Sequence, residues 1–252
     1  MFIRTESFKD FIRFYPIVST IVAIQLVIWL LIALGSPLGN FILQWGIGVN
    51  LLVEQGEYWR HITPIFLHSG TTHVLFNSFS LVLFGPALEQ MLGKFKFILV
   101  YLATGIIANI FTYYLESSPY YTHLGASGAI YGLFGVYLYM VFLRKDLIDR
   151  ANAQIVTTIL VIGLVMTFVQ SNINISAHLF GVISGLAFGP IILHNVEPFS
   201  IYRNRKRTKD ESIPFDPNRW NKKRYRYKKY IGPIIWTIIA LLVLFGLLSN
   251  FF

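Results

Sequence analysis

Residues 125–143 read GASGAIYGLFGVYLYMVFL, a stretch that is apolar on all sides, carries no charge and opens with a serine between small residues. A soluble helix needs one polar face, so this pattern indicates a helix that lies inside a membrane. Other stretches are also apolar enough to cross a bilayer as helices of about 20 residues. The predicted spans are 16–35, 71–92, 96–114, 127–143, 152–170, 177–194 and 231–251.

The composition agrees with an all-α polytopic membrane protein. Hydrophobic residues make up 55% of the 252 residues, and charged residues make up 13%, about half the share usual in soluble domains. The chain has no cysteine, which excludes disulfides, thiolate metal ligands and a cysteine nucleophile. The formal net charge is nevertheless +9, so the positive charge must be concentrated in the loops.

The distribution of Lys and Arg predicts the orientation. With a cytoplasmic N-terminus, twenty of the 21 Lys and Arg residues fall on the cytoplasmic side, and Arg60 alone falls on the other. Membrane proteins carry such an excess of positive charge in their cytoplasmic loops. We therefore expect a cytoplasmic N-terminus and an external C-terminus.

The apolar spans and the positions of Lys and Arg together divide the chain into four parts. We expect a cytoplasmic N-terminal segment at 1–15, a six-span domain at 16–194, a basic cytoplasmic linker at 195–230 and a seventh transmembrane helix at 231–252. A basic segment beside a membrane attracts anionic lipids, and we expect this role for the linker rather than binding of nucleic acid. Nothing in the sequence sets the oligomeric state.

Five polar residues gather at the predicted outer ends of three spans, where polar groups are costly and mark candidate functional sites. They are His68, His73, Asn77, Ser127 and His178. Because three separated segments bring polar groups to one depth, we expect these side chains to form a single site.

A serine nucleophile requires a base and nearby hydrogen-bond donors for the oxyanion. Ser127 begins its span, where free backbone N–H groups favour an anion. His178 shares a helix face with Gly181 and Gly185, and Gly128 continues the small-residue face of the Ser127 span. Two such faces pack closely, which would bring His178 against Ser127. Because spans three to six contain no Asp or Glu, we expect a Ser–His dyad rather than a triad.

Two more residues of the group fit an oxyanion hole. His73 and Asn77 are four residues apart, face the same way on a helix and can both donate hydrogen bonds. A metal site formed by His68, His73 and His178 is the alternative. Against a metal, no carboxylate lies in the neighbouring spans, and the spacing matches no zinc motif, so we expect neither a metal nor another cofactor.

These residues resemble a known family over residues 10–195. The motifs are Trp59-Arg60, His68-x4-His73-x3-Asn77, Gly125-x-Ser127-Gly128 and Ala177-His178-x2-Gly181-x3-Gly185. In order and spacing they resemble the rhomboid intramembrane serine proteases. The resemblance implies a six-helix rhomboid-like bundle, to which this chain adds one C-terminal helix.

The resemblance also implies roles. Ser127 would be the nucleophile, and His178 would be the general base. His73, Asn77 and the Ser127 N–H would form the oxyanion hole. Tyr131 would pack against His178, and Arg60 would stabilise the loop before the second span.

A protein of this family would lie in the plasma membrane of a bacterium with its site open to the extracytoplasmic side. It would cleave single-pass membrane proteins near the outer end of their spans. Two alternatives remain, a catalytically inactive relative that binds membrane clients and a channel or transporter. The presence of both Ser127 and His178 argues against the first. The restriction of the polar cluster to one end of the spans argues against the second.

Overall fold

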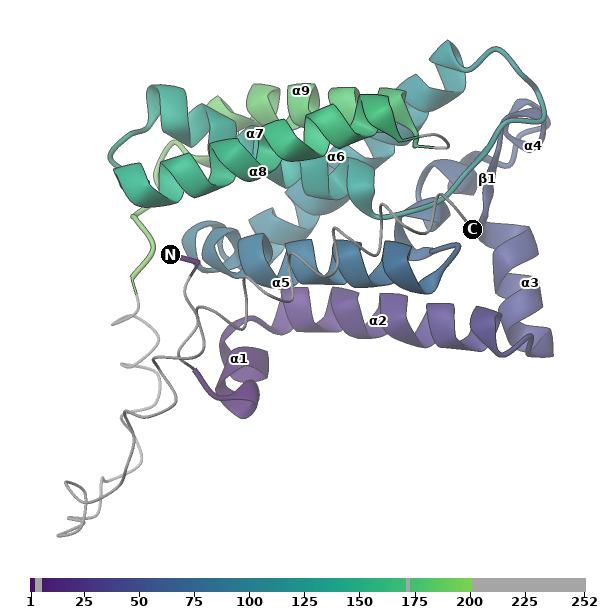
Figure 1. Cartoon of the computed structure of the whole chain (residues 1–252), viewed down its shortest axis with the longest axis horizontal. Helices are drawn as coiled ribbons and strands as arrows, with labels where there is room; N and C mark the ends of the chain where they lie inside the picture. Colours follow the sequence, from purple (N-terminus) through teal and green to yellow (C-terminus); the bar gives the residue numbers. More distant parts are fainter. Residues whose placement is uncertain (3–5, 171–172, 201–252) are drawn as a thin grey trace, which may run out of the picture. The chain divides into compact units, whose positions relative to one another are not determined.

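The structure, a computed structural model, describes residues 1–2, 6–170 and 173–200, which form a helical domain (Figure 1). The seventh helix predicted at 231–252 lies outside the described residues, as does the linker beyond residue 200. The described part of the predicted 195–230 linker, residues 195–200, is not helical.

Six of the described helices correspond to the first six predicted spans. Five are long and apolar enough to cross a membrane: α2 (Pro16–Ala33), α5 (Thr71–Leu92), α6 (Lys94–Leu115), α8 (Arg150–Val169) and α9 (Ile175–Ile192). The sixth, α7 (Ser127–Leu143), is apolar but shorter. A further helix, α1 (Phe8–Phe14), precedes α2.

Two helices begin before the predicted starts at residues 152 and 177, because polar caps precede their apolar residues. The Asn174 side chain accepts a hydrogen bond from the Ala177 N–H at 2.8 Å, so α9 begins at Ile175. The Asp149 side chain caps α8 in the same way. Capping residues satisfy the free N–H groups of the first turn, and hydropathy does not detect them.

The segment between α2 and α5 is folded rather than a free loop. It contains α3 (Pro37–Gly46), β1 (Gly48–Val49), α4 (Asn50–Glu54) and two 3-10 helices, η1 (Tyr58–His61) and η2 (Thr63–Phe66). Strand β1 pairs antiparallel with β2 (Thr122–His123), with Gly48 opposite His123. This pairing ties the segment to the residues that lead into α7.

The helices pack around one core. Helix α2 lies beside α5, while α7, α8 and α9 lie side by side with α6 against them (Figure 1). Large side chains fill the space between them: Tyr15, Leu81, Phe84, Phe97, Tyr101, Leu133, Tyr137 and Met140. The buried Glu89 of α5 accepts hydrogen bonds from the Ile17 and Val18 N–H groups, and so caps the start of α2. Polar contacts of this kind fix the helices relative to one another.

Candidate active site

Ser127 is the first residue of α7, directly after a tight backbone turn. Gly125 has φ +133°, a conformation that L side chains rarely adopt. No side chain caps α7, so the N–H groups of its first turn remain available. The Ala126 N–H, just outside the helix, donates to His68 Nε2 at 3.5 Å. The nucleophile candidate therefore lies beside backbone donors that can stabilise an anion.

Close packing of α7 on α9 brings together the N-terminal ends of the two helices, where Ser127 and His178 lie. A Cβ added at Gly181 would collide with the Gly128 carbonyl, and a Cβ at Gly185 would collide with the Gly132 carbonyl. In the described part of the chain, no hydrogen bond joins Ser127 to His178. Catalytic hydrogen bonds are often long in substrate-free enzymes and shorten when substrate binds.

His178 is buried and is held on two sides. Its ring stacks on the Tyr131 ring with centroids 4.0 Å apart and planes 16° apart. Its Nδ1 lies 2.7 Å from the hydroxyl oxygen of Thr167, on α8. With Nδ1 engaged by Thr167, Nε2 is the ring nitrogen left to meet Ser127.

His73 of α5 lies against Gly125, and Asn77 is one turn further along the same face of α5. A Cβ added at Gly125 would lie 2.6 Å from His73 Nε2 and 3.9 Å from Ser127 Oγ, so both atoms border Gly125. The Asn77 side chain is buried, and its Nδ2 has no hydrogen-bond partner among the described residues. A buried amide donor without a partner is costly in a folded protein and is expected where a reacting oxygen is to be bound.

Comparison with known proteins decides the family. Residues 55–195, more than half of the chain, match the model of the Rhomboid domain. The chain belongs to the rhomboid family.

Its relatives include named proteases. The rhomboid is 54% identical over 188 residues to the Putative rhomboid protease YdcA of Bacillus subtilis, an alignment that covers 73% of this chain and 92% of the relative. It is 37% identical over 166 residues to the Rhomboid protease GluP of Bacillus subtilis, covering 65% of this chain and 32% of that protein. The Rhomboid protease AarA of Providencia stuartii is 32% identical over 180 residues, covering 61% and 64%. The rhomboid described here is therefore a serine protease and an integral membrane protein.

Other motif residues of the rhomboid support the site from a distance. The buried Arg60 forms an ion pair with Glu57 at 2.6 Å and donates to the carbonyls of Gln44 and Ile47. Trp59 stacks on Trp45 with centroids 5.0 Å apart. These contacts hold the α3–η1 segment together, and none of them joins Arg60 or Trp59 to the candidate catalytic residues.

His68 supports the turn before Ser127. Its ring is buried and meets the His73 ring edge-on, with centroids 4.9 Å apart. Burial, and to a lesser extent the charge of His73, lowers the pKa of His68 to about 3. A neutral His68 can accept the Ala126 N–H through Nε2. Within the described ranges, no three His, Cys, Asp or Glu side chains are grouped as metal ligands would be.

Two residues beside the site, Thr167 and Asn174, were not among the predicted site residues. Thr167 contacts His178, and Asn174 caps α9 while its amide bonds to Thr112 of α6. Both are small polar residues near helix ends, where their side chains commonly bond to the local backbone. Their position near the ends of α8 and α9 was the one available signal.

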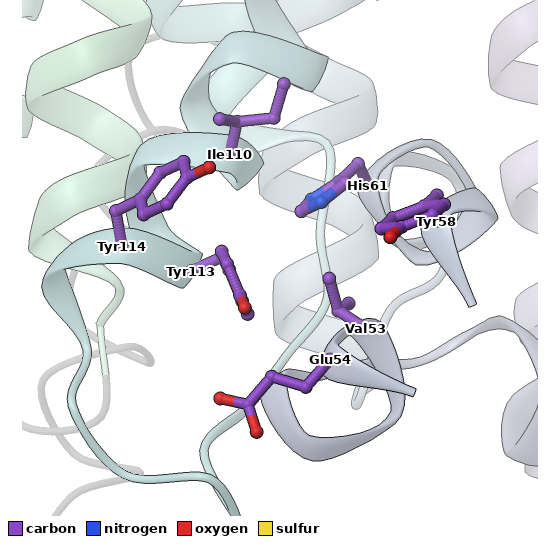
Figure 2. Close-up of a pocket in the computed structure, with 7 residues that line it drawn as sticks. All are labelled: Val53, Glu54, Tyr58, His61, Ile110, Tyr113 and Tyr114. Carbon is purple, nitrogen blue, oxygen red and sulfur yellow. The ribbon is translucent and has the colours of Figure 1, made fainter. Parts of the chain in front are cut away.

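A separate hollow lies between α4, η1 and the last turns of α6. Figure 2 shows the side chains around it, and its volume is about 400 Å³. The lining residues are Val53, Glu54, Tyr58, His61, Ile110, Tyr113 and Tyr114. None of the candidate catalytic residues lines this hollow, so it is distinct from the Ser127 cluster.

Proposed function

We propose that this rhomboid hydrolyses peptide bonds in the transmembrane segments of other membrane proteins, with Ser127 and His178 as a catalytic dyad. The observation that carries the proposal is the close packing of α7 on α9. Ser127 is the first residue of α7, and the buried His178 lies near the N-terminal end of α9. Two side chains support it as possible donors to the oxyanion: the Asn77 amide, which has no partner among the described residues, and His73 beside Gly125.

The proposed reaction follows the general scheme of serine hydrolases. Ser127 Oγ attacks the carbonyl carbon of the scissile bond while His178 Nε2 takes the hydroxyl proton. The carbonyl oxygen becomes negative and is stabilised by His73, Asn77 and the Ser127 N–H. His178 then gives the proton to the leaving amine, and a water molecule, activated by the same histidine, hydrolyses the acyl-enzyme.

The chemistry constrains the substrate. In an α-helix the carbonyl carbon is shielded, because its oxygen is hydrogen-bonded within the helix. A substrate span must therefore unwind locally before Ser127 can attack. We expect a preference for helix-breaking residues near the cut and, from the family resemblance, for a small residue before it.

The proposal places the site on the extracytoplasmic side. The excess of Lys and Arg in the loops at the opposite ends of the spans supports this orientation. Water would reach Ser127 from that side, and the substrate would be cut near its outer end. We further propose that the basic segment after residue 200 binds anionic lipid at the cytoplasmic surface.

A co-reconstitution assay tests the proposed activity. Purified enzyme and a single-span reporter protein are placed in the same vesicles, and cleavage is followed by gel electrophoresis. We expect Ser127→Ala to abolish cleavage, and Ser118→Ala, which changes an exposed serine, to leave it intact. Cleavage by Ser127→Ala at the wild-type rate would refute the dyad. Binding of the reporter with no cleavage by the wild-type chain would instead indicate a client-binding protein.

A further inference from the structure

The dyad histidine has a hydrogen-bond partner where a triad would have an acid. His178 Nδ1 lies 2.7 Å from Thr167 Oγ1, and both side chains are buried, at 7% and 1% exposure. The described spans α6 to α9 contain no Asp or Glu that could take this place, and Asp149 caps the other end of α8. The contact therefore joins the base to a neutral hydroxyl from a neighbouring helix.

The donors and acceptors in this contact can be assigned from hydrogen-bond capacity. A threonine hydroxyl has one hydrogen and two acceptor lone pairs. Thr167 Oγ1 lies 2.7 Å from the Gly163 carbonyl oxygen, which can only accept, so the hydroxyl hydrogen is directed there. Thr167 must then accept from His178, which places a proton on Nδ1 and leaves the Nε2 lone pair free.

Thr167 is itself held in position by the residues around it. The Tyr131 hydroxyl lies 3.3 Å from Thr167 Oγ1 and, by the same assignment, donates to it. A Cβ added at Gly163 would lie 2.6 Å from the Tyr131 oxygen, so Gly163 leaves the space that this hydroxyl occupies. The buried residues of α8 are Val156, Leu160 and Thr167. Thr167 therefore lies on the face of α8 that packs into the protein, and its hydroxyl meets His178 there.

We propose that Thr167 is a positioning residue that fixes His178 in the Nδ1–H tautomer, with Nε2 aimed at Ser127. This inference rests on the proposed Ser127–His178 dyad and adds the group that orients its base. An orienting partner on the second ring nitrogen is a general requirement for a histidine base. A threonine that only bonded to its own helix backbone would satisfy Gly163 and have no effect on His178.

Kinetics of three variants test the role of the hydroxyl. Thr167→Val keeps the side-chain shape but removes the hydroxyl, whereas Thr167→Ser retains it. Thr158→Val makes the same change at an exposed position of α8. We expect Thr167→Val to lower kcat roughly 10-fold with little change in KM, since one orienting hydrogen bond is lost. Thr167→Ser should restore most of kcat, and Thr158→Val should match the wild type.

The kinetic results distinguish failure of the positioning role of Thr167 from failure of the proposed dyad. Wild-type kcat in Thr167→Val, or a Thr167→Ser enzyme as slow as Thr167→Val, would overturn the positioning role while leaving the dyad intact. Cleavage by His178→Ala at the wild-type rate would instead overturn the proposed function. These measurements are made on the full chain in vesicles.

A spectroscopic readout covers the case in which a variant is too unstable for kinetics. Ring ¹⁵N chemical shifts of His178, in wild-type protein with labelled histidine, report which nitrogen carries the proton. Comparison with His178→Ala assigns the signal. We expect a protonated Nδ1 and an unprotonated Nε2 at neutral pH. An unprotonated Nδ1 with a protonated Nε2 would overturn the proposal without reference to activity.

Discussion

Tyr131 and His178 lie face to face, with ring centroids 4.0 Å apart and planes inclined by 16°. Tyr131 is four residues after Ser127, so it lies one turn further along the same face of α7. The helix that carries the candidate nucleophile therefore also carries the surface on which the candidate base rests. Rotation of the imidazole is limited by the ring on one side and by Thr167 at Nδ1.

Two substitutions of Tyr131 distinguish the contribution of its ring from that of its hydroxyl. We expect Tyr131→Leu to lower kcat by about 5-fold, because the stacked surface is worth on the order of 1 kcal/mol. Tyr131→Phe retains the stack and should retain most of the activity. The measurement is kcat on a reporter span at saturating concentration. Equal activity of the Leu and Phe variants would show that stacking does not orient His178.

The Asn77 amide is expected to act on the transition state. Asn77→Asp keeps the size of the side chain but removes the N–H donors, and we expect kcat to fall about 100-fold with KM nearly unchanged. Ser78→Ala is the matched control, since Ser78 is the next residue of α5, is also buried and has a hydroxyl without a described partner. A fall in activity of equal size in both variants would point to a general effect on α5 rather than to an oxyanion hole.

Gly125 is expected to be required for space as well as for backbone conformation. Gly125→Ala introduces a Cβ 2.6 Å from His73 Nε2, and Gly56→Ala introduces one that meets nothing within 4 Å. Both glycines have positive φ, at +133° and +100°, so both substitutions carry backbone strain of about 1–3 kcal/mol. Activity is measured per amount of folded protein. We expect only Gly125→Ala to lose activity, by about 10-fold or more. Similar activity of the two variants would exclude a role for the His73 contact.

We expect the free energy of unfolding to fall in acid, because His123 is buried outside the spans and resists protonation in the folded chain. Burial, with a smaller contribution from His61, lowers the pKa of His123 to about 4. The unfolded chain binds a proton on this residue below about pH 6.5, whereas the folded chain does not until about pH 4. The stability that neutral His123 maintains is thus fully present above pH 6.5 and is lost as the pH falls toward 4.

Unfolding in detergent at pH 7 and pH 5 measures this effect. For His123 alone the loss at pH 5 is on the order of 2 kcal/mol. We expect His123→Phe to reduce the pH dependence of the free energy of unfolding. An unaltered pH dependence in His123→Phe would contradict the assignment.

The sequence was sufficient to predict the six long helices of the described residues but not the way in which the segments between them fold. A run of apolar residues such as 16–35 has only one favourable environment, so its length predicts a membrane helix directly. The pairing of Gly48 with His123 joins segments far apart in the chain through backbone hydrogen bonds. No side-chain pattern in two-residue strands encodes that pairing, so it could not be predicted.

The candidate site shows the same division. Ser127 and His178 could be chosen because a polar group in an apolar helix end is unusual, and glycine spacing indicated which helices pack. Thr167 could not be chosen, because threonine hydroxyls in membrane helices usually bond to their own backbone. Its contact with His178 depends on the rotation of α8 about its axis, which hydropathy does not determine.

Covalent labelling tests the central claim, that Ser127 is a nucleophile activated by His178, most directly. The full-length protein in vesicles is treated with a fluorophosphonate, digested and analysed by mass spectrometry. We expect one label per chain, on Ser127, with labelling lost in Ser127→Ala and strongly slowed in His178→Ala. Labelling of the wild-type chain at a serine other than Ser127, or an unchanged rate in His178→Ala, would contradict the account.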